Sequence, residues 1–321
     1  MNRLLLSAVI VTGLGLWSAV VWAGNTPLPE QKDRPEVVEV KHGGMTRTSL
    51  VYVPSGYDGK KAVPLVLSFH GRHGQGKDQA SLTELHKVGE RHGFIVAYPD
   101  GVGKSWNAKH GTGEAEARGV DDVGFVDALL ATLSERFKID PNRIYASGMS
   151  NGGFFAHRLG CERSTRFAAI ATVAGEMAPA LESVCKPEEP IPVLIIHGTR
   201  DRIVPFAGGK TDGGGSLLSA EKTAEVWSRL NDARGQAKET FKKGKVTCRS
   251  YQDGRAPVTL CSVEGAGHTW PGGDQYAPRL LVGTTNNDVN ASEMIWEFFD
   301  ANPRGSRKSR RPAPPSALRM K

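Results

Sequence analysis

The chain has 321 residues, which is enough for one large α/β domain or two small ones with a substantial core. Its formal charge of +7 suggests an anionic partner, but seven basic residues and no acidic ones lie between Pro303 and Lys321. The rest of the chain is close to neutral, so the composition argues against a nucleic-acid-binding protein.

The N-terminus has the parts of a secretory signal peptide. Arg3 supplies a positive charge, Leu4–Val21 is mostly apolar, and Val21-Trp22-Ala23 ends on a small residue. This pattern predicts a signal peptide over residues 1–23 with cleavage after Ala23, and therefore a secreted or periplasmic protein. Because the apolar run is near the length that spans a bilayer, an uncleaved membrane anchor is the alternative.

Strands and helices are expected to alternate up to residue 137. Residues 36–40 and 49–53 read as strands, with a hairpin turn at His42-Gly43-Gly44 between them. Nearly continuous apolar runs, typical of strands buried on both faces, occupy residues 64–69 and 94–98. Helices are expected over residues 81–92 and from Asp121 to Phe137, where apolar residues recur on one helical face.

The next stretch, residues 143–153, has the form of a nucleophile elbow. An apolar strand runs into Gly148-Met149-Ser150-Asn151-Gly152, and a helical pattern follows from Phe154. Such a turn holds the serine in strained backbone geometry. Glycine is expected at 148 and 152 because a Cβ at either place would collide with the neighbouring strand or helix. The pattern also recurs by chance, so its structural context has to support it.

The chain after the elbow continues the alternation. Buried strands are expected over residues 168–173 and 192–197, a helix over 219–230, and a strand pair over 246–250 and 258–263. A final helix opens at Asn290-x-x-Glu293, a capping-box pattern. Together these elements predict an α/β fold, with a doubly wound, mainly parallel sheet in a single catalytic domain over residues 24–301.

The cysteines fit export to an oxidising compartment. There are four, and the sequential pairing Cys161–Cys185 and Cys248–Cys261 is the simplest of three connectivities. Their spacing does not match that of zinc ligands, so we expect structural disulfides.

Residues 302–321 form a basic, proline-rich tail that is expected to be disordered. It could hold the protein weakly to an anionic cell surface by charge. A solvated tail without a partner is the alternative.

A nucleophilic serine needs a base, and the base needs a carboxylate that fixes its tautomer. In the α/β-hydrolase fold these residues follow the order Ser, Asp/Glu, His. The histidines well beyond the elbow are His197 and His268. We expect His268, in a glycine-rich loop, to be the base of Ser150, and Asp201, four residues past a strand, to be the acid.

Other candidates for these roles have simpler explanations. His197 is expected to be a packing residue at a strand end, Asp121 and Asp122 are expected to start a helix, and Asp253 is expected in a turn.

The oxyanion hole is expected to use two backbone N–H groups, those of Asn151 and of Arg72 in His70-Gly71-Arg72-His73-Gly74. A metal at His70 and His73 is not expected, because no carboxylate stands beside them at ligand spacing.

Six short motifs occur in order along the chain: His70-Gly71, Tyr98-Pro99-Asp100-Gly101, Val120-Asp121-Asp122-Val123-Gly124-Phe125, Gly148-Met149-Ser150-Asn151-Gly152-Gly153, His197-Gly198-Thr199-x-Asp201 and Gly267-His268-Thr269-Trp270-Pro271-Gly272. They resemble the secreted polyhydroxybutyrate depolymerase/feruloyl esterase family over about residues 49–299. The resemblance implies Ser150, Asp201 and His268 as the triad, an ester substrate and no cofactor. Arg72 departs from it, because relatives often have cysteine there.

The sequence thus predicts a secreted serine carboxylic-ester hydrolase that forms an acyl-enzyme. No polymer-binding module is apparent, which favours soluble esters: feruloyl or acetyl groups on plant polysaccharide, or hydroxyalkanoate oligomers. Trp106 and Trp270 are candidate walls of an aromatic or sugar subsite, with core packing as the alternative. A peptidase of the same fold is a rival. So is an exported binding protein on a retired hydrolase scaffold, although such a descendant would be expected to have lost a triad member.

Overall fold

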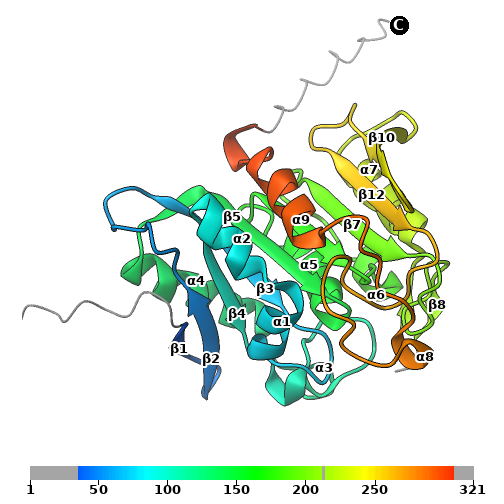
Figure 1. Cartoon of the computed structure of the whole chain (residues 1–321). Helices are drawn as coiled ribbons and strands as arrows, with labels where there is room; N and C mark the ends of the chain where they lie inside the picture. Colours follow the sequence, from blue (N-terminus) through cyan, green and yellow to red (C-terminus); the bar gives the residue numbers. More distant parts are fainter. Residues whose placement is uncertain (1–34, 212–213, 307–321) are drawn as a thin grey trace, which may run out of the picture. The chain divides into compact units, whose positions relative to one another are not determined.

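A ten-stranded mixed sheet organises the chain (Figure 1). The computed structural model describes residues 35–211 and 214–306. In spatial order the strands are β1 (Glu36–His42), β2 (Met45–Tyr52), β4 (Ile95–Pro99), β3 (Val63–Phe69), β5 (Ile139–Met149), β6 (Ala169–Val173), β7 (Val193–Gly198), β12 (Val258–Val263), β11 (Val246–Tyr251) and β10 (Lys238–Lys243). Neighbours from β4 to β12 run parallel, and antiparallel strands flank them on both sides. The predicted doubly wound, mainly parallel sheet is confirmed.

Helices cover both faces of this sheet. They are α1 (Gly76–Thr83), α2 (Leu85–His92), α3 (Glu114–Ala117), α4 (Asp122–Arg136), α5 (Asn151–Glu162), α6 (Pro179–Glu182), α7 (Ala220–Leu230), α8 (Arg279–Val282) and α9 (Ala291–Asp300). Short 3-10 turns, η1 (Val102–Lys104) and η2 (Arg304–Ser306), and a small sheet of β8 (Gly209–Lys210) and β9 (Ser216–Leu217) complete the described elements.

Two apolar cores result from the alternation of side chains along each strand. In β3, Leu65 and Leu67 pack in the core that contains residues of α4, α5 and α7, whereas Val66 packs in the core of α1, α2 and α9. Successive side chains of a strand point to opposite faces, so a strand buried on both sides must be apolar throughout. All described residues belong to one compact unit.

Some boundaries differ from the sequence-based expectation. The helix expected over residues 81–92 is two helices, because Glu84 adopts a left-handed conformation with φ of 46° between α1 and α2. Strand β10 was not expected, since its residues are exposed and all but Phe241 are polar, but it pairs with β11 at the sheet edge. The predicted hairpin turn is confirmed: Gly43 and Gly44 have φ of 56° and 76°.

The predicted start of the tail, residue 302, is too early. The Asn302 side chain donates to the Phe298 carbonyl, and the Arg304 guanidinium donates to the Thr165 carbonyl, so the fold continues through η2. Residues 307–321 and the predicted signal peptide lie outside the described residues. Within the described ranges, no helix has the length and apolar character needed to span a bilayer.

Both expected disulfides are present. Cys161 at the end of α5 bonds Cys185, and Cys248 bonds Cys261 directly opposite it on the β11–β12 pair. The sequential connectivity is therefore confirmed.

Candidate active site

Ser150 lies in the sharp turn between β5 and α5. Its backbone has φ of 54° and ψ of −123°, a left-handed conformation that is costly for a residue with a Cβ. The turn needs its glycines: a Cβ on Gly148 would lie 2.3 Å from the Gly152 carbonyl oxygen, and a Cβ on Gly152 would lie 2.2 Å from that of Phe69. The local sequence therefore folds into the expected elbow.

Asp201 and His268 meet at the same edge of the sheet. Asp201 follows β7 and His268 follows the parallel neighbour β12, so both emerge at the carboxyl ends of adjacent strands. His268 Nδ1 lies 2.7 Å from Asp201 Oδ2, and Asp201 Oδ1 accepts hydrogen bonds from the N–H groups of Ile203 and Val204. The carboxylate can thus hold the proton of His268 on Nδ1 and leave Nε2 as the base.

The environment keeps Asp201 ionised. Burial alone would raise the pKa of this carboxyl, but hydrogen bonds from His197 and His268 outweigh that cost and hold the pKa well below its ordinary value.

Ser150 and His268 line one pocket of about 610 Å³. Apolar side chains make up much of its wall: Leu82, Met149, Phe154, Val204, Leu281 and Val282. Among the described residues no hydrogen bond joins Ser150 to His268, and such catalytic contacts often tighten only with substrate.

The two expected oxyanion donors border Ser150. The N–H of Asn151 opens α5, where a helix has no acceptor of its own for it. The Gly71 carbonyl accepts from His70 Nδ1 at 2.8 Å and from the Gly74 N–H at 3.1 Å. Because C=O and N–H point in opposite directions across a trans peptide, these bonds fix the direction of the Arg72 N–H. A Cβ on Gly71 would lie 3.4 Å from Ser150 Cβ, so this peptide passes close to the serine.

His197 does more than pack at a strand end. Its Nε2 lies 3.3 Å from Asp201 Oδ2 and 2.9 Å from the Val204 carbonyl oxygen, and its Nδ1 lies 2.5 Å from Glu176 Oε1. Since a carbonyl only accepts, Nε2 carries a proton and faces the Asp201 carboxylate. Burial alone would lower the pKa of His197, but Asp201 and Glu176 raise it to about 10.

The sequence did not predict that His197 contacts both Asp201 and Glu176. The four-residue spacing of His197 and Asp201 was a usable signal, but nothing in the sequence around Glu176 marked it as a partner.

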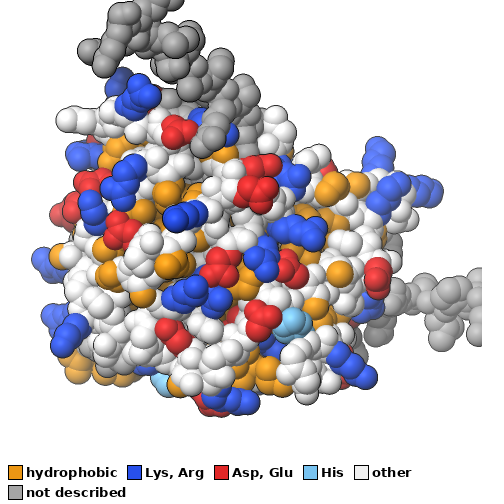
Figure 2. Space-filling view, turned by 180° about the vertical axis from the view of Figure 1, so that it is seen from behind, with side chains coloured by type: hydrophobic (Ala, Val, Ile, Leu, Met, Phe, Trp, Pro, Cys, Tyr) orange, Lys and Arg blue, Asp and Glu red, His pale blue; other side chains and the backbone are white. Residues whose placement is uncertain are grey.

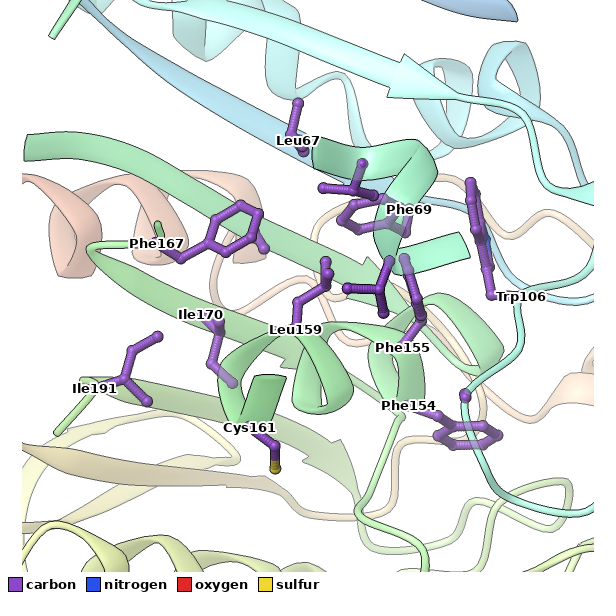
Figure 3. Packing of buried hydrophobic residues seen from close by; sticks show 14 of the residues in the cluster. Leu67, Phe69, Trp106, Phe154, Phe155, Leu159, Cys161, Phe167, Ile170 and Ile191 are labelled. Atoms are coloured by element: carbon purple, nitrogen blue, oxygen red, sulfur yellow. The ribbon is translucent and has the colours of Figure 1, made fainter. Parts of the chain in front are cut away.

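The proposed role of Trp106 and Trp270 in walling the pocket is wrong. Both indoles are buried and neither lines the pocket. Trp106 packs against Phe69 and Phe155 in the core, as Figure 3 shows, and Trp270 Nε1 donates to Ser292 Oγ. Large aromatic rings bury more apolar surface in a core than at a rim, which explains both positions.

The backbone of Trp106 is nevertheless held beside the elbow. The side chain of Asn151 accepts from the Trp106 N–H at 2.7 Å and donates to its carbonyl at 3.1 Å.

Asp121 and Asp122 both start α4, but Asp122 has a further role. Asp121 accepts from the Gly124 N–H as the helix cap. Asp122 is buried, lies 2.7 Å from Arg47 and accepts from the Asn107 N–H. The ion pair joins β2 to α4, and the hydrogen bond from the Asn107 N–H joins α4 to the loop that carries Trp106.

His70 is a structural residue. Its Nδ1 donates to the Gly71 carbonyl, and its Nε2 accepts from the Gly101 N–H at 2.9 Å, so both nitrogens are occupied. The part of the chain that the structure describes contains no cluster of three or more His, Cys, Asp or Glu residues able to hold a metal.

Comparison with known proteins places the chain among esterases. Residues 48–186 match the family described as Esterase PHB depolymerase. "Putative esterase NocK" of Nocardia uniformis subsp. tsuyamanensis is 30% identical over 282 residues, which cover 81% of each chain. "Feruloyl esterase B" of Piromyces equi is 30% identical over 234 residues, which cover 69% of this chain and 42% of the relative.

Solved structures of esterases share the fold. The acetyl xylan esterase from Aspergillus awamori aligns with a TM-score of 0.57 at 14% identity, over 83% of this chain and 99% of its own. The ferulic acid esterase AmCE1/Fae1A from Anaeromyces mucronatus, in complex with ferulic acid, aligns with a TM-score of 0.52 at 18% identity, over 86% of this chain and 93% of its own. These likenesses confirm the predicted α/β-hydrolase fold.

Proposed function

The chain belongs to the polyhydroxybutyrate depolymerase/feruloyl esterase-like family and is a carboxylic ester hydrolase, and from this premise we propose that Ser150, His268 and Asp201 are its catalytic triad. One arrangement carries the proposal. A serine in strained backbone shares a pocket with an imidazole whose Nδ1 lies 2.7 Å from a buried carboxylate.

The reaction proceeds through an acyl-enzyme. His268 Nε2 accepts the Ser150 hydroxyl proton while Oγ attacks the ester carbonyl carbon, and Asp201 stabilises the imidazolium that forms. The N–H groups of Arg72 and Asn151 donate to the oxyanion of the tetrahedral intermediate. The intermediate collapses, His268 protonates the departing alcohol, and Ser150 keeps the acyl group. Water then attacks the acyl carbonyl while His268 accepts its proton. The bond between the acyl carbon and Ser150 Oγ breaks, His268 returns the proton to Oγ, and the acid is released.

The substrates are esters of feruloyl or acetyl groups on plant polysaccharide, or hydroxyalkanoate esters. The names of relatives support the first class: "Feruloyl esterase B" and "Bifunctional acetylxylan esterase/xylanase XynS20E" are both 30% identical to this chain where they match. The family description supports the second. The apolar pocket wall suits an acyl group of either kind.

We further propose that the protein is exported. The two disulfides support an oxidising compartment, and the N-terminal 23 residues have the composition of a signal peptide.

Hydrolysis of a short-chain p-nitrophenyl ester by the purified protein tests the triad. We expect Ser150→Ala to lower kcat by about 10⁴-fold or more, because the nucleophile is lost. Ser147→Ala is the matched control: Ser147 lies on β5, the strand that leads into Ser150, and its buried hydroxyl has no hydrogen-bond partner among the described residues. An organophosphonate should label Ser150 in the wild type. If the wild type neither turns over the ester nor is labelled at Ser150, the proposal is wrong.

A further inference from the structure

A polar pair interrupts the apolar wall of the pocket. His110 and Thr112, in the loop before α3, both line the pocket that contains Ser150. Thr112 Oγ1 lies 2.6 Å from His110 Nε2, and Glu116 Oε2 lies 3.2 Å from His110 Nδ1. The His110 side chain is only 3% exposed. The three residues therefore repeat, beside the catalytic pocket, the order hydroxyl, imidazole, carboxylate.

This arrangement determines which hydrogen bonds Thr112 can still make. The Glu116 carboxylate favours a proton on the near nitrogen, Nδ1, so that His110 Nε2 is left to accept the Thr112 hydroxyl proton. That proton is the only one that Thr112 can donate. Its oxygen keeps a lone pair, so Thr112, which lines the pocket, retains a hydrogen-bond acceptor.

The Glu116 carboxylate, which orients His110, is held in its ionised form. Glu116 accepts hydrogen bonds from the N–H groups of His110 and Gly111, each at 3.0 Å. Burial alone would raise the pKa of Glu116, but His110 and these N–H groups outweigh it, and the pKa lies below its ordinary value.

The loop that carries Thr112 is fixed at several points. Asn107 donates its N–H to Asp122 at 2.7 Å, and its carbonyl accepts from Arg158 at 2.6 Å. The His110 ring packs on Phe154, with 4.8 Å between centroids, and Phe154 lies in the first turn of α5, the helix that begins after Ser150. The acceptor on Thr112 thus has a defined place relative to the nucleophile.

Two other polar side chains of the wall, those of Gln79 and Asp78, form hydrogen bonds within the protein. Gln79 donates to Ser68 Oγ, and Asp78 accepts from the Gln75 N–H. A few polar atoms at fixed positions in an apolar pocket determine its specificity. A ligand group that covers such an atom without forming a hydrogen bond to it removes its water, and this costs free energy.

We propose that Thr112 Oγ1, oriented by His110 and Glu116, accepts a hydrogen bond from a hydroxyl group on the acyl part of the ester, and so selects hydroxylated acyl groups. This inference rests on the proposed function. The alcohol oxygen must remain next to His268 to receive its proton, whereas Thr112 belongs to a different segment of the wall. A phenolic hydroxyl of a hydroxycinnamate and the 3-hydroxyl of a hydroxyalkanoate share this donor chemistry.

Matched ester pairs test the proposal and separate the two sources. One arm compares methyl 4-hydroxycinnamate with methyl cinnamate and methyl 4-methoxycinnamate. The other compares p-nitrophenyl 3-hydroxybutyrate with p-nitrophenyl butyrate. Within each arm the leaving group is constant, so the ratio of kcat/KM for the hydroxylated over the unhydroxylated ester reports the acyl hydroxyl alone.

We expect the wild-type protein to prefer the hydroxylated ester in one arm by about tenfold, the ratio that corresponds to one neutral hydrogen bond. Thr112→Val should abolish that preference, and Thr112→Ser, which keeps the hydroxyl, should restore most of it. Thr211→Val is the matched control, since Thr211 also lines the pocket but its hydroxyl contacts the Gly215 carbonyl at 3.5 Å and is not held by an imidazole. This variant should keep the wild-type ratio.

The possible results are distinct. Turnover without a preference for the hydroxylated ester in either arm overturns the inference and leaves the proposed function intact; this result needs no variant, so it holds even if Thr112→Val does not fold. A preference that survives in folded Thr112→Val also overturns it. Absence of turnover of every ester, together with failure of the organophosphonate to label Ser150, contradicts the proposed function itself.

Discussion

Two backbone N–H groups and two imidazoles surround the carboxylate of Asp201. Ile203 and Val204 donate to Oδ1, while His268 and His197 approach Oδ2. The carboxylate cannot rotate without losing several of these contacts. His197 therefore positions the acid of the proposed triad, and Glu176 in turn holds His197.

Replacement of His197 should reveal its charge through the pH dependence of stability. We expect His197→Ala to lower the free energy of unfolding by about 3 kcal/mol near pH 7, because Glu176 loses its buried partner. The pKa of His197 is about 10 in the folded protein, above the value of about 6.5 expected for the unfolded chain. The stabilisation is then complete below about pH 6.5 and is lost as the pH rises toward 10. Urea unfolding of both proteins from pH 6.5 to 10 should show the difference shrinking.

His157 offers a matched control. It is equally buried, but it accepts from the Trp227 indole and burial lowers its pKa to about 4, so it is neutral throughout this range. His157→Ala should cost a similar amount of stability at every pH from 7 to 10. A penalty for His197→Ala that is equally flat would show that His197 carries no extra proton.

At the scale of elements, the first turn of α5 rests on the end of β3. Gly152 makes the contact, since a Cβ there would lie 2.2 Å from the Phe69 carbonyl oxygen and 2.6 Å from that of His70. Both obstacles are backbone atoms and cannot rotate away. The chain after His70 carries the Arg72 N–H, so this contact sets the distance between the two proposed oxyanion donors.

We expect Gly152→Ala to lower kcat by about 10²-fold, the loss typical of one displaced oxyanion donor. The measurement is kcat on a p-nitrophenyl ester, together with the melting temperature to confirm that the variant folds. Gly56→Ala is the control, because a Cβ there meets nothing within 4 Å. Wild-type kcat in a folded Gly152→Ala protein would contradict this account of the oxyanion hole.

Across the whole molecule, the parallel part of the sheet gathers the site. The loops after β3, β5, β7 and β12 carry Arg72, Ser150, Asp201 and His268, and in a parallel sheet these loops share one edge (Figure 1). On the face of the molecule in Figure 2, basic and acidic side chains are interspersed.

The disulfides should contribute to global stability rather than to chemistry. Cys161 and Cys185 are separated by 24 residues, so we expect the double variant Cys161→Ser/Cys185→Ser to lose about 3 kcal/mol of unfolding free energy in the chain-entropy account. Urea unfolding under oxidising conditions measures the loss, and kcat should stay near that of the wild type. The bond between Cys248 and Cys261 closes a shorter separation of 13 residues, so its removal should cost slightly less. Equal stability of the wild type and the first variant would contradict the prediction.

Local patterns were sufficient for much of the fold and for the candidate site. Buried strands are continuous apolar runs. The elbow is a five-residue motif whose glycines are required because nearby backbone atoms leave no room for a Cβ. The order Ser, Asp, His follows from the order of the strands. Each of these features depends on neighbours in sequence or on strand succession. The sequence by itself therefore determined Ser150, Asp201 and His268 as the candidates, and the cysteine pairing.

Only the tertiary structure decided which partners surround them. Glu176 and His197 lie on different segments, Arg47 and Asp122 are far apart in the chain, and Trp106 enters the core instead of the pocket. Likewise, only the tertiary structure shows that His110 and Thr112, which contact each other, line the pocket that contains Ser150. Burial and ion pairing between distant segments depend on how the elements pack, and the spacing of residues along one chain carries no record of that packing.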